Sequence, residues 1–512
     1  MKKFRLTLLF ILLLALQISP PQARAALIRI LHVNDFHGFA EPYEPLGARE
    51  KLGGAAYLAA RVEALRKEKP SLLLAAGDMI SGNNWANLFK GRPVIELMNL
   101  MRFDALVVGN HEFDYGPAVL RQSIAAAKFP VLGANVAGLD ALKPYVVRQV
   151  DGVRVGIIGV VTEDTPVTTH PTNVAGLKFL PVVPTVEKYL RELKNQADIF
   201  VVLSHIGFRA DMDLAAKVPG IDIIVGGHSH TKIPTPKKVG NTIIVQAWEH
   251  GKALGVLDLT VEGGKIVKFS GHLEEIKPAG AAPDPAAARL VKYYQEEVDA
   301  RLGQTIGATL VDLDGENVRT RETNFGDFVA DIMRETTGAD AALINGGAIR
   351  VGIRKGPLTK SQIYSALPFD NYLVAIRLTG RQIRAALEHG VSRVQERKGR
   401  FPQVSGLAFT YSPVAPPGRR VKAITIARQP LDPERQYTVA TIDFLAAGGD
   451  GYQGFGEAVR ASADYSNIGG ALRGKNLVYT DPSRLLRDIV ADYIQRRKRI
   501  SPALEGRIKT VN

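Results

Sequence analysis

The chain has 512 residues, which exceeds the size of one ordinary hydrophobic core and predicts two large domains. It has no cysteine, which excludes disulfides, thiolate metal ligands and a cysteine nucleophile. The formal net charge of +14 favours anionic substrates, although a nucleic acid or an acidic membrane surface would be attracted equally.

The N-terminus has the pattern of a secretory signal peptide over residues 1–25. Basic residues at positions 2, 3 and 5 precede an apolar run over 6–16, and Ala23-Arg24-Ala25 offers the small residues that a signal peptidase reads. The run is shorter than a bilayer span requires, so we expect no stable membrane anchor. Removal of residues 1–25 takes away four basic and no acidic residues, which leaves a net charge of +10. We predict export across the inner membrane to the periplasm, which argues against nucleic acid as a partner.

The region 26–276 has the pattern of an α/β domain, because short apolar runs alternate with amphipathic helical segments. Five of the apolar runs are strand candidates that end in residues able to bind a metal ion. These strands are predicted at 28–33, 72–76, 105–108, 199–203 and 221–225. The residues that follow them are Asp35, His37, Asp78, Asn110, His111, His205, His228 and His230. In an α/β sheet, ligands gather at the carboxyl ends of strands, so these clusters can converge on one spot.

The spacing within the clusters supports a shared site. Asp35 and His37 lie two residues apart, as do His228 and His230, and alternate residues of an extended segment share a face. Five of the ten histidines directly follow apolar strand runs, an arrangement with a chance probability of roughly one in fifty. The other five are His32, His170, His250, His272 and His389. We expect no site role for four of them, whereas His250 follows a further predicted strand and its role stays open.

These blocks, in this order, resemble the motifs of the calcineurin-like metallophosphoesterases. The resemblance implies a β-sandwich flanked by helices, with two divalent metal ions. One ion would be held by the residues Asp35, His37, Asp78 and His230. The second would be held by Asp78, Asn110, His205 and His228, so that Asp78 bridges the two. The mixture of oxygen and imidazole ligands suits zinc, manganese or iron better than calcium.

Such a two-metal site suits phosphoester hydrolysis, because the cations bind phosphate oxygens and lower the pKa of a water that attacks in line. His111 is then free to act on the transition state or on the leaving oxygen. Asp114, three residues later, is expected to orient the imidazole of His111 as its carboxylate partner. The resemblance implies the same two roles.

A linker and a hinge helix are predicted over 277–302. The segment 277–285 is rich in Pro, Ala and Gly, which is linker composition. The segment 286–302 has a helical pattern, and its apolar face is predicted to consist of Leu290, Tyr293, Tyr294 and Val298.

A second α/β domain is predicted over 303–512. Its clearest elements are a helix at 323–337, which Gly338 can end, and a strand at 341–344. The Asn345–Arg350 segment follows that strand with a Gly-Gly turn, which suits an anion or a polar ring, although an ordinary tight turn has the same pattern. A basic cluster at 496–499 ends another helical pattern, where cations suit the helix dipole.

Three segments together resemble the C-terminal domain of the 5′-nucleotidase family: Asn345–Arg350, Leu367–Asn371 and Asp443–Tyr452. The similarity covers essentially all of the chain after residue 25. The resemblance implies that Phe369 and Phe444 sandwich a nucleobase, and stacking contributes about 1–3 kcal/mol per base. Asp450 would bind ribose hydroxyls. The other implied contacts to base, ribose or phosphate are Arg319, Asn345, Gly347, Arg350 and Asn371.

The predicted function is an exported 5′-nucleotidase with two metal ions, such as Zn or Mn, that also accepts UDP-sugars as a nucleotide-sugar substrate. Two alternatives share the domain plan: a 2′,3′-cyclic-nucleotide phosphodiesterase with 3′-nucleotidase activity, and a sulfur-oxidation thiosulfohydrolase. The two phenylalanines favour a substrate that carries a base. A nucleotide-binding protein without catalysis would require the loss of metal ligands, and every ligand type is present.

Overall fold

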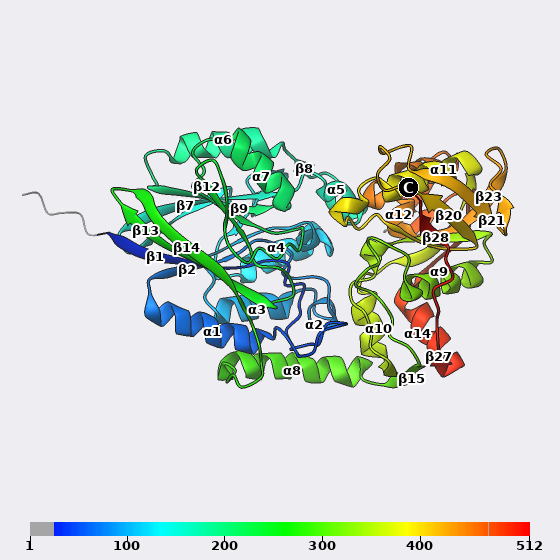
Figure 1. Cartoon of the computed structure of the whole chain (residues 1–512), viewed down its shortest axis with the longest axis horizontal. Coiled ribbons are helices and arrows are strands. Elements are labelled where there is room, and N and C mark those ends of the chain that lie inside the picture. The colour runs from blue at the N-terminus through cyan, green and yellow to red at the C-terminus, as the bar shows by residue number, and fades with distance from the viewer. Residues whose placement is uncertain (1–24, 469–470, 512) are drawn as a thin grey trace, which may run out of the picture.

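The computed structural model describes residues 25–468 and 471–511, so the predicted signal peptide lies outside the described residues except for Ala25. Two α/β domains lie side by side, and α8 (Pro285–Leu302) runs along the first domain towards the second (Figure 1). No helix within these two ranges is long and apolar enough to cross a membrane.

The N-terminal domain is a sandwich of two six-stranded sheets. The first has the order β14-β13-β1-β2-β3-β4, with the bounds Lys265–Glu275, Ala253–Glu262, Ala26–Val33, Ser71–Ala75, Ala105–Val107 and Val131–Leu132. The second has the order β11-β12-β10-β9-β7-β6, with the bounds Lys237–Val239, Thr242–Gln246, Ile223–Gly226, Ile199–His205, Val153–Val161 and Tyr145–Val150. Strands β1 to β4 are parallel, as are β7, β9, β10 and β12, so the carboxyl ends of each set meet at one edge.

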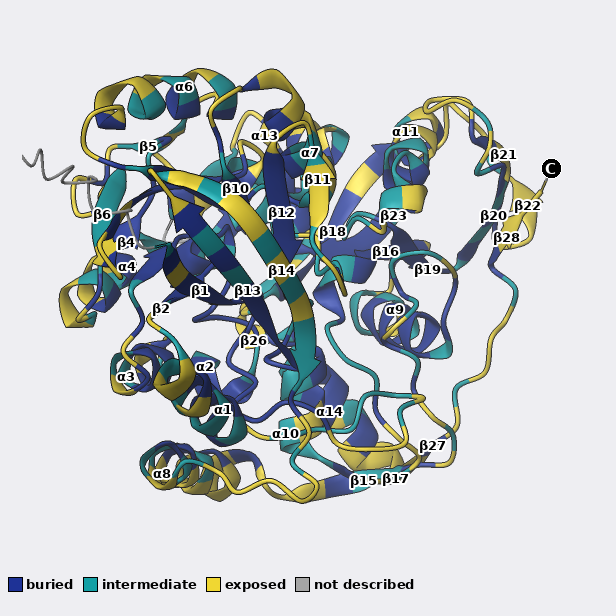
Figure 2. Ribbon diagram, turned by 60° about the vertical axis from the view of Figure 1, so that its left-hand side comes forward, coloured by how far each residue is buried: buried dark blue, intermediate teal, exposed yellow. Residues whose placement is uncertain are grey.

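Apolar residues on both faces of β1 explain the layers of this domain. Ile28 and Ile30 pack in the core between the sheets, whereas Leu31 and Val33 pack against helices. The first sheet is covered by α1 and α3 together with α8, and the second by α6 and α7. Their bounds are Ala55–Glu68, Arg92–Leu100, Val182–Leu193 and Phe208–Lys217. This arrangement confirms the predicted β-sandwich flanked by helices, and Figure 2 shows its central strands buried.

Shorter elements of the N-terminal domain lie in its connections. The helices α2, α4 and α5 have the bounds Asn84–Asn87, Gly116–Ala126 and Thr165–Thr168. A small antiparallel pair, β5 and β8, has the bounds Val136–Ala137 and Lys178–Phe179. Several of these segments face the C-terminal domain, among them α5 (Figure 1).

The C-terminal domain is built on a five-stranded sheet of the order β19-β16-β23-β18-β26, with the bounds Pro402–Ser405, Ala341–Asn345, Gln436–Ile442, Tyr372–Thr379 and Leu477–Leu485. Two smaller sheets have the orders β17-β15-β27 and β22-β21-β20-β28, with the bounds Gly356–Thr359, Thr305–Thr309, Arg499–Ile500, Gln429–Pro430, Val421–Ile426, Leu407–Tyr411 and Ile508–Thr510. A two-stranded ladder joins β24 and β25, Ser466–Ile468 and Ala471–Arg473. The helices α9 to α14 span Asn324–Thr337, Lys360–Ala366, Gly380–Val391, Asp443–Ala446, Gln453–Arg460 and Leu486–Arg497.

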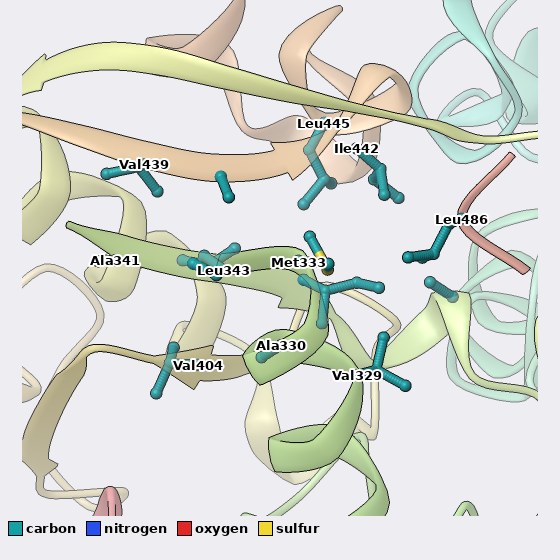
Figure 3. Close-up of a cluster of buried hydrophobic side chains, with 14 of the residues drawn as sticks. Val329, Ala330, Met333, Ala341, Leu343, Val404, Val439, Ile442, Leu445 and Leu486 are labelled. Carbon is teal, nitrogen blue, oxygen red and sulfur yellow. The ribbon is translucent and has the colours of Figure 1, made fainter. Parts of the chain in front are cut away.

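Helix α9 forms the centre of this second core. Figure 3 shows Val329 and Met333 of α9 beside Leu343 of β16, and all three are buried. The side chain of Thr323 accepts a hydrogen bond from the backbone N–H of Gly326 at 3.0 Å, and Gly338 ends the helix with a left-handed φ of 65°. Both predicted ends of this helix are confirmed.

Helix α8 packs on the N-terminal domain, but the prediction of its buried face was wrong at one position. Tyr294 is buried, whereas the neighbouring Tyr293 is 61% exposed. The Tyr294 hydroxyl donates to Glu96 at 2.9 Å, and the Trp85 indole N–H donates to the backbone oxygen of Val291 at 3.3 Å. Adjacent helical residues point about 100° apart, so only one of the two tyrosines can face α3.

Candidate active site

The seven predicted metal ligands lie at one edge of the sandwich, where the two sheets meet. They lie at or directly after the carboxyl ends of β1, β2 and β3 of the first sheet, and of β9 and β10 of the second. Five of them have a left-handed backbone conformation, with φ between 49° and 73°: Asp35, His37, Asp78, His228 and His230. This conformation is uncommon outside glycine and costs about 1–2 kcal/mol per residue. Its concentration in one cluster indicates a site that the surrounding fold holds in place.

These side chains form two adjoining groups that can each hold a metal ion. One group is Asp35, His37 and His230, and the other is Asp78, His205 and His228. Within each group the ligand atoms lie within 4.8 Å of one another. Asp78 Oδ2 lies 3.1 Å from His205 Nε2 in its own group and 3.8 Å from His37 Nε2 in the other. Asp78 is thus placed between the groups.

The hydrogen bonds behind three of the histidines decide which ring nitrogen faces the centre. The Nδ1 atoms of His37 and His205 lie 2.8 and 2.7 Å from the backbone oxygens of Ser81 and Ala76. A carbonyl oxygen can only accept, so each Nδ1 carries a proton, which leaves Nε2 as the nitrogen that can bind a metal ion. His230 Nδ1 likewise donates to the carboxylate of Glu249.

The donor set fits a metal centre. The Nε2 atoms of His37 and His230 lie 3.3 Å apart, a separation that suits two ligands of one cation. Asn110 Oδ1 and His205 Nε2 are buried and make no hydrogen bond within the described part of the chain. Burial, together with nearby cations, holds the pKa values of His37 and His228 well below the usual range, which keeps both imidazoles neutral.

His111 and Asp114 are in direct contact, as the sequence predicted. His111 Nδ1 lies 2.8 Å from Asp114 Oδ2. Asp114 is fixed in turn by the hydroxyls of Ser81 and Thr169, which donate to it at 2.6 and 2.9 Å. The backbone N–H of His111 donates to Asp78 Oδ1 at 2.9 Å. His111 is therefore anchored at two points beside the proposed metal centre, and its Nε2 is left for a ligand.

Two carboxylates that support the site were not identified from the sequence. Glu112 is buried and accepts hydrogen bonds from the backbone N–H groups of Asp78, Met79 and Gly109 at 2.8, 2.7 and 2.5 Å. Glu249 accepts from His230 Nδ1 and from Lys252 Nζ, the latter at 2.6 Å. Glu112 directly follows the predicted site residues Asn110 and His111, so its position was a usable signal, whereas nothing near Glu249 in the sequence points to His230.

His250, whose role the sequence left open, lies behind the metal centre. It forms a third candidate ligand group with His230 and Glu249. Its Nδ1 lies 2.8 Å from the Tyr43 hydroxyl, and its ring stacks on Phe39 at 3.9 Å between centroids. These contacts hold its ring against the domain core.

A cavity of about 1620 Å³ joins the two domains at this edge. From the N-terminal domain it is lined by predicted catalytic and metal-binding residues, namely Asp78, Asn110, His111, Asp114, His228 and His230. From the C-terminal domain it is lined by all eight predicted substrate-binding residues, namely Arg319, Asn345, Gly347, Arg350, Phe369, Asn371, Phe444 and Asp450. Asp35, His37 and His205 are buried beneath its floor.

Contacts across the cavity bring the two predicted clusters together. Arg350 Nη2 donates to His37 Nε2 at 2.9 Å, and the Phe369 ring stacks on His111 with 5.5 Å between centroids. Asn345 Nδ2 donates to Asp450 Oδ2 at 2.6 Å. Burial, together with nearby cations, lowers the pKa of Arg319 to about 10, which indicates a desolvated guanidinium suited to an anion.

Two family models match this sequence. The calcineurin-like phosphoesterase model matches residues 28–232, and the model of the 5′-nucleotidase C-terminal domain matches residues 302–457. The chain is 32% identical to the 5′-nucleotidase of Homo sapiens, with 96% of this chain and 92% of that protein covered. It is 31% identical to the snake venom 5′-nucleotidase of Naja atra, with 94% and 98% covered. It is also 32% identical to the trifunctional nucleotide phosphoesterase protein YfkN of Bacillus subtilis, of whose length it spans 35%.

Solved structures show the same architecture. The 5′-nucleotidase precursor from Thermus thermophilus is 34% identical, with a TM-score of 0.86 and coverage of 95% of this chain and 99% of that one. The sulfate thiohydrolase SoxB from the same species has a TM-score of 0.79 over 95% and 97% of the two chains. Its identity of 20% shows a shared fold alone.

Proposed function

Because the chain belongs to the 5′-nucleotidase family and is a metal-dependent phosphoester hydrolase, we propose that it hydrolyses nucleoside 5′-monophosphates to nucleoside and phosphate. The observation that carries the proposal is the shared cavity. Its floor holds the metal-ligand cluster, and its opposite wall holds Phe369 and Phe444. A substrate with a base at one end and a phosphate at the other matches both.

We assign two divalent ions, such as Zn or Mn, to the ligand cluster. Asp35, His37, Asp78 and His230 would hold one ion, and Asp78, Asn110, His205 and His228 the other. Bound ions of this kind neutralise phosphate oxygens and activate a water for in-line attack. The protein contributes fixed imidazoles and carboxylates that need little rearrangement to bind them.

His111 is assigned to the leaving oxygen or to a phosphoryl oxygen. The Asp114 carboxylate fixes the Nδ1 side of the ring, which leaves Nε2 to hold or donate a proton in the cavity. The same carboxylate stabilises the imidazolium form that donates. Phe369 stacks against His111, so the proposed nucleobase site is in contact with the residue assigned to acid–base catalysis.

The C-terminal wall is assigned to the nucleoside. Phe369 and Phe444 would stack on the base, which tolerates different bases because each has a π face. Asp450, held by Asn345, would accept hydrogen bonds from ribose hydroxyls. Arg319 and Arg350 would bind phosphate oxygens. The remaining assigned contacts to base, ribose or phosphate are Gly347 and Asn371.

The size of the cavity favours a wider substrate range that includes UDP-sugars. Ligand pockets usually measure about 300–1,000 Å³, and this cavity is larger. We further propose export to the periplasm with removal of residues 1–25, a metallophosphoesterase domain at 26–276, a linker and hinge helix at 277–302, and a substrate domain at 303–512.

The test is turnover by purified protein, first stripped with EDTA and then supplied with Zn²⁺ or Mn²⁺. AMP, UDP-glucose, 2′,3′-cyclic AMP and 3′-AMP are compared by kcat/KM. We expect metal-dependent phosphate release with AMP preferred over the cyclic and 3′ substrates. Preference for either of these would support the cyclic phosphodiesterase instead. Binding of AMP without turnover under all metal conditions would support a nucleotide-binding protein without catalysis.

A further inference from the structure

His170, for which the sequence predicted no site role, lies where the two domains meet at the cavity. It follows α5 of the N-terminal domain, which reaches towards α12 of the C-terminal domain (Figure 1). His170 Nε2 lies 3.4 Å from Asp443 Oδ2, and its ring centroid lies 6.4 Å from that of Phe444. His170, Asp443 and Phe444 all line the cavity. A side chain of the metal-binding domain therefore faces the base-binding wall.

The contacts of His170 fix its direction. The backbone N–H of Thr172 donates to His170 Nδ1 at 3.4 Å, and the Thr172 hydroxyl lies 2.7 Å from the same atom. A backbone N–H can only donate, so Nδ1 carries the lone pair and Nε2 carries the proton of the neutral ring. That proton faces the carboxylate of Asp443.

Asp443 joins the segments that carry two predicted substrate contacts, Asn371 and Phe444. Its Oδ1 accepts a hydrogen bond from the backbone N–H of Tyr372 at 3.1 Å, next to Asn371. Asp443 directly precedes Phe444 at the start of α12. The Asp443 carboxyl group is buried. Burial raises its pKa, and the contact with His170 offsets part of this increase. A buried carboxylate needs donors on both oxygens, and His170 is the donor that comes from the other domain.

We propose that His170 and Asp443 form a bridge between the domains that positions Phe444 and Asn371 for the nucleoside. His170 is a positioning residue, because it acts through Asp443. When the bridge is formed, the Phe444 segment is held against the N-terminal domain, so the base-binding wall is in place before the nucleoside binds. The inference rests on the proposed nucleoside-binding role of Phe444.

The experiment measures adenosine binding and catalysis separately, on full-length protein loaded with Mn²⁺. Calorimetry gives the Kd for adenosine, which has a base and no phosphate. Steady-state assays give KM and kcat for AMP, and kcat/KM for p-nitrophenyl phosphate, which has no base. The variants are H170A, H170Q and the control H272A. His272 is an exposed histidine of the same domain on the edge strand β14.

H170A is expected to raise the Kd for adenosine and the KM for AMP about tenfold, the size of one lost hydrogen bond to a charged group. The kcat for AMP and the rate with p-nitrophenyl phosphate are expected to stay near wild type. H170Q should recover most of the affinity, because its amide can donate from a position close to that of Nε2. H272A should match wild type throughout.

A double-mutant cycle tests the route through Asp443. If His170 acts through that carboxylate, adding H170A to D443N changes the Kd for adenosine far less than H170A alone. Additive effects, an unchanged Kd in H170A, or equal losses with AMP and p-nitrophenyl phosphate would each overturn the bridge. A wild-type protein that binds adenosine without hydrolysing AMP would refute the proposed function, and the Kd comparison would still decide the bridge. A wild-type protein that fails to bind adenosine would refute the bridge as well.

Discussion

At the scale of single residues, carboxylates orient two imidazoles of this site. Asp114 holds His111, and Glu249 holds His230. In both pairs the carboxylate accepts from Nδ1, so Nε2 is the ring nitrogen left for a ligand. The two pairs differ in consequence, because His230 belongs to a metal-ligand group and His111 does not.

Replacement of His111 with alanine should separate catalysis from metal binding. The metal content is expected to survive, because the ligand groups do not include this residue. The rate of AMP hydrolysis should fall about 10²- to 10⁴-fold, the usual weight of acid–base catalysis. Mass spectrometry of bound metal and kcat for AMP check the two halves of this prediction. Loss of metal from H111A would make His111 a ligand and its assigned role wrong.

Glu249→Gln should weaken metal binding although Glu249 belongs to neither of the two ligand sets assigned to the metal ions. The amide no longer offers a charged acceptor to His230 Nδ1, which lowers the basicity of Nε2 and frees the ring to turn. We expect metal affinity to fall about 10- to 100-fold. Competition with a metal-binding dye measures the affinity. Glu297→Gln, at an exposed position of α8, is the matched control. Unchanged affinity in E249Q would show that the Glu249–His230 pair does not contribute to metal binding.

At the scale of elements, the ends of the parallel strands position the site residues, and α8 packs along the first domain. The parallel strands of the two sheets deliver their polar ends to one edge. Helix α8 packs on α1 and α3 through one apolar face. Tyr294 belongs to that face, since its ring contacts Trp85 and Phe89 at 5.7 and 4.7 Å between centroids.

The two adjacent tyrosines of α8 give a stability test. Tyr294→Ala removes a buried ring and its hydrogen bond to Glu96, so the free energy of unfolding should fall by about 3–5 kcal/mol. Tyr293→Ala removes an exposed ring and should change it by about 0.5 kcal/mol or less. Urea unfolding measures both. Equal effects of the two changes would contradict the observed orientation of the helix.

At the scale of the whole molecule, the cavity is lined by residues of both domains. Under the proposed function, the first domain would supply the metal site and the second the nucleoside contacts. The two functions should therefore be separable by mutation. A variant of the second domain can lose recognition of the base while the metal centre still works.

The double variant F369A/F444A is expected to lose kcat/KM for AMP strongly, because it removes both faces of a stack that contributes about 1–3 kcal/mol per base. The kcat/KM for p-nitrophenyl phosphate should change much less, since this substrate has no base. Comparing both substrates on one preparation cancels differences in active fraction. An equal loss on both would assign the two rings to core packing, and no loss on AMP would remove them from the base site.

The sequence by itself determined the metal-ligand candidates, the two-domain plan and helix α9. Each ligand cluster is placed at the end of an apolar strand, and α9 has a clear helical period that ends at Gly338, so local patterns were sufficient. The family resemblance added the substrate residues, because stacking rings such as Phe369 and Phe444 look like core residues in isolation.

Only the tertiary structure decided which neighbours support those residues. Glu249 reaches His230, and His170 reaches Asp443, through contacts between segments that lie far apart in the chain. Tyr293 and Tyr294 are indistinguishable by composition until the packing of α8 buries one of them. The physical reason is common to all three cases. A side chain's role depends on its burial and on the group opposite it, and both are fixed only when the sheets, helices and domains are assembled.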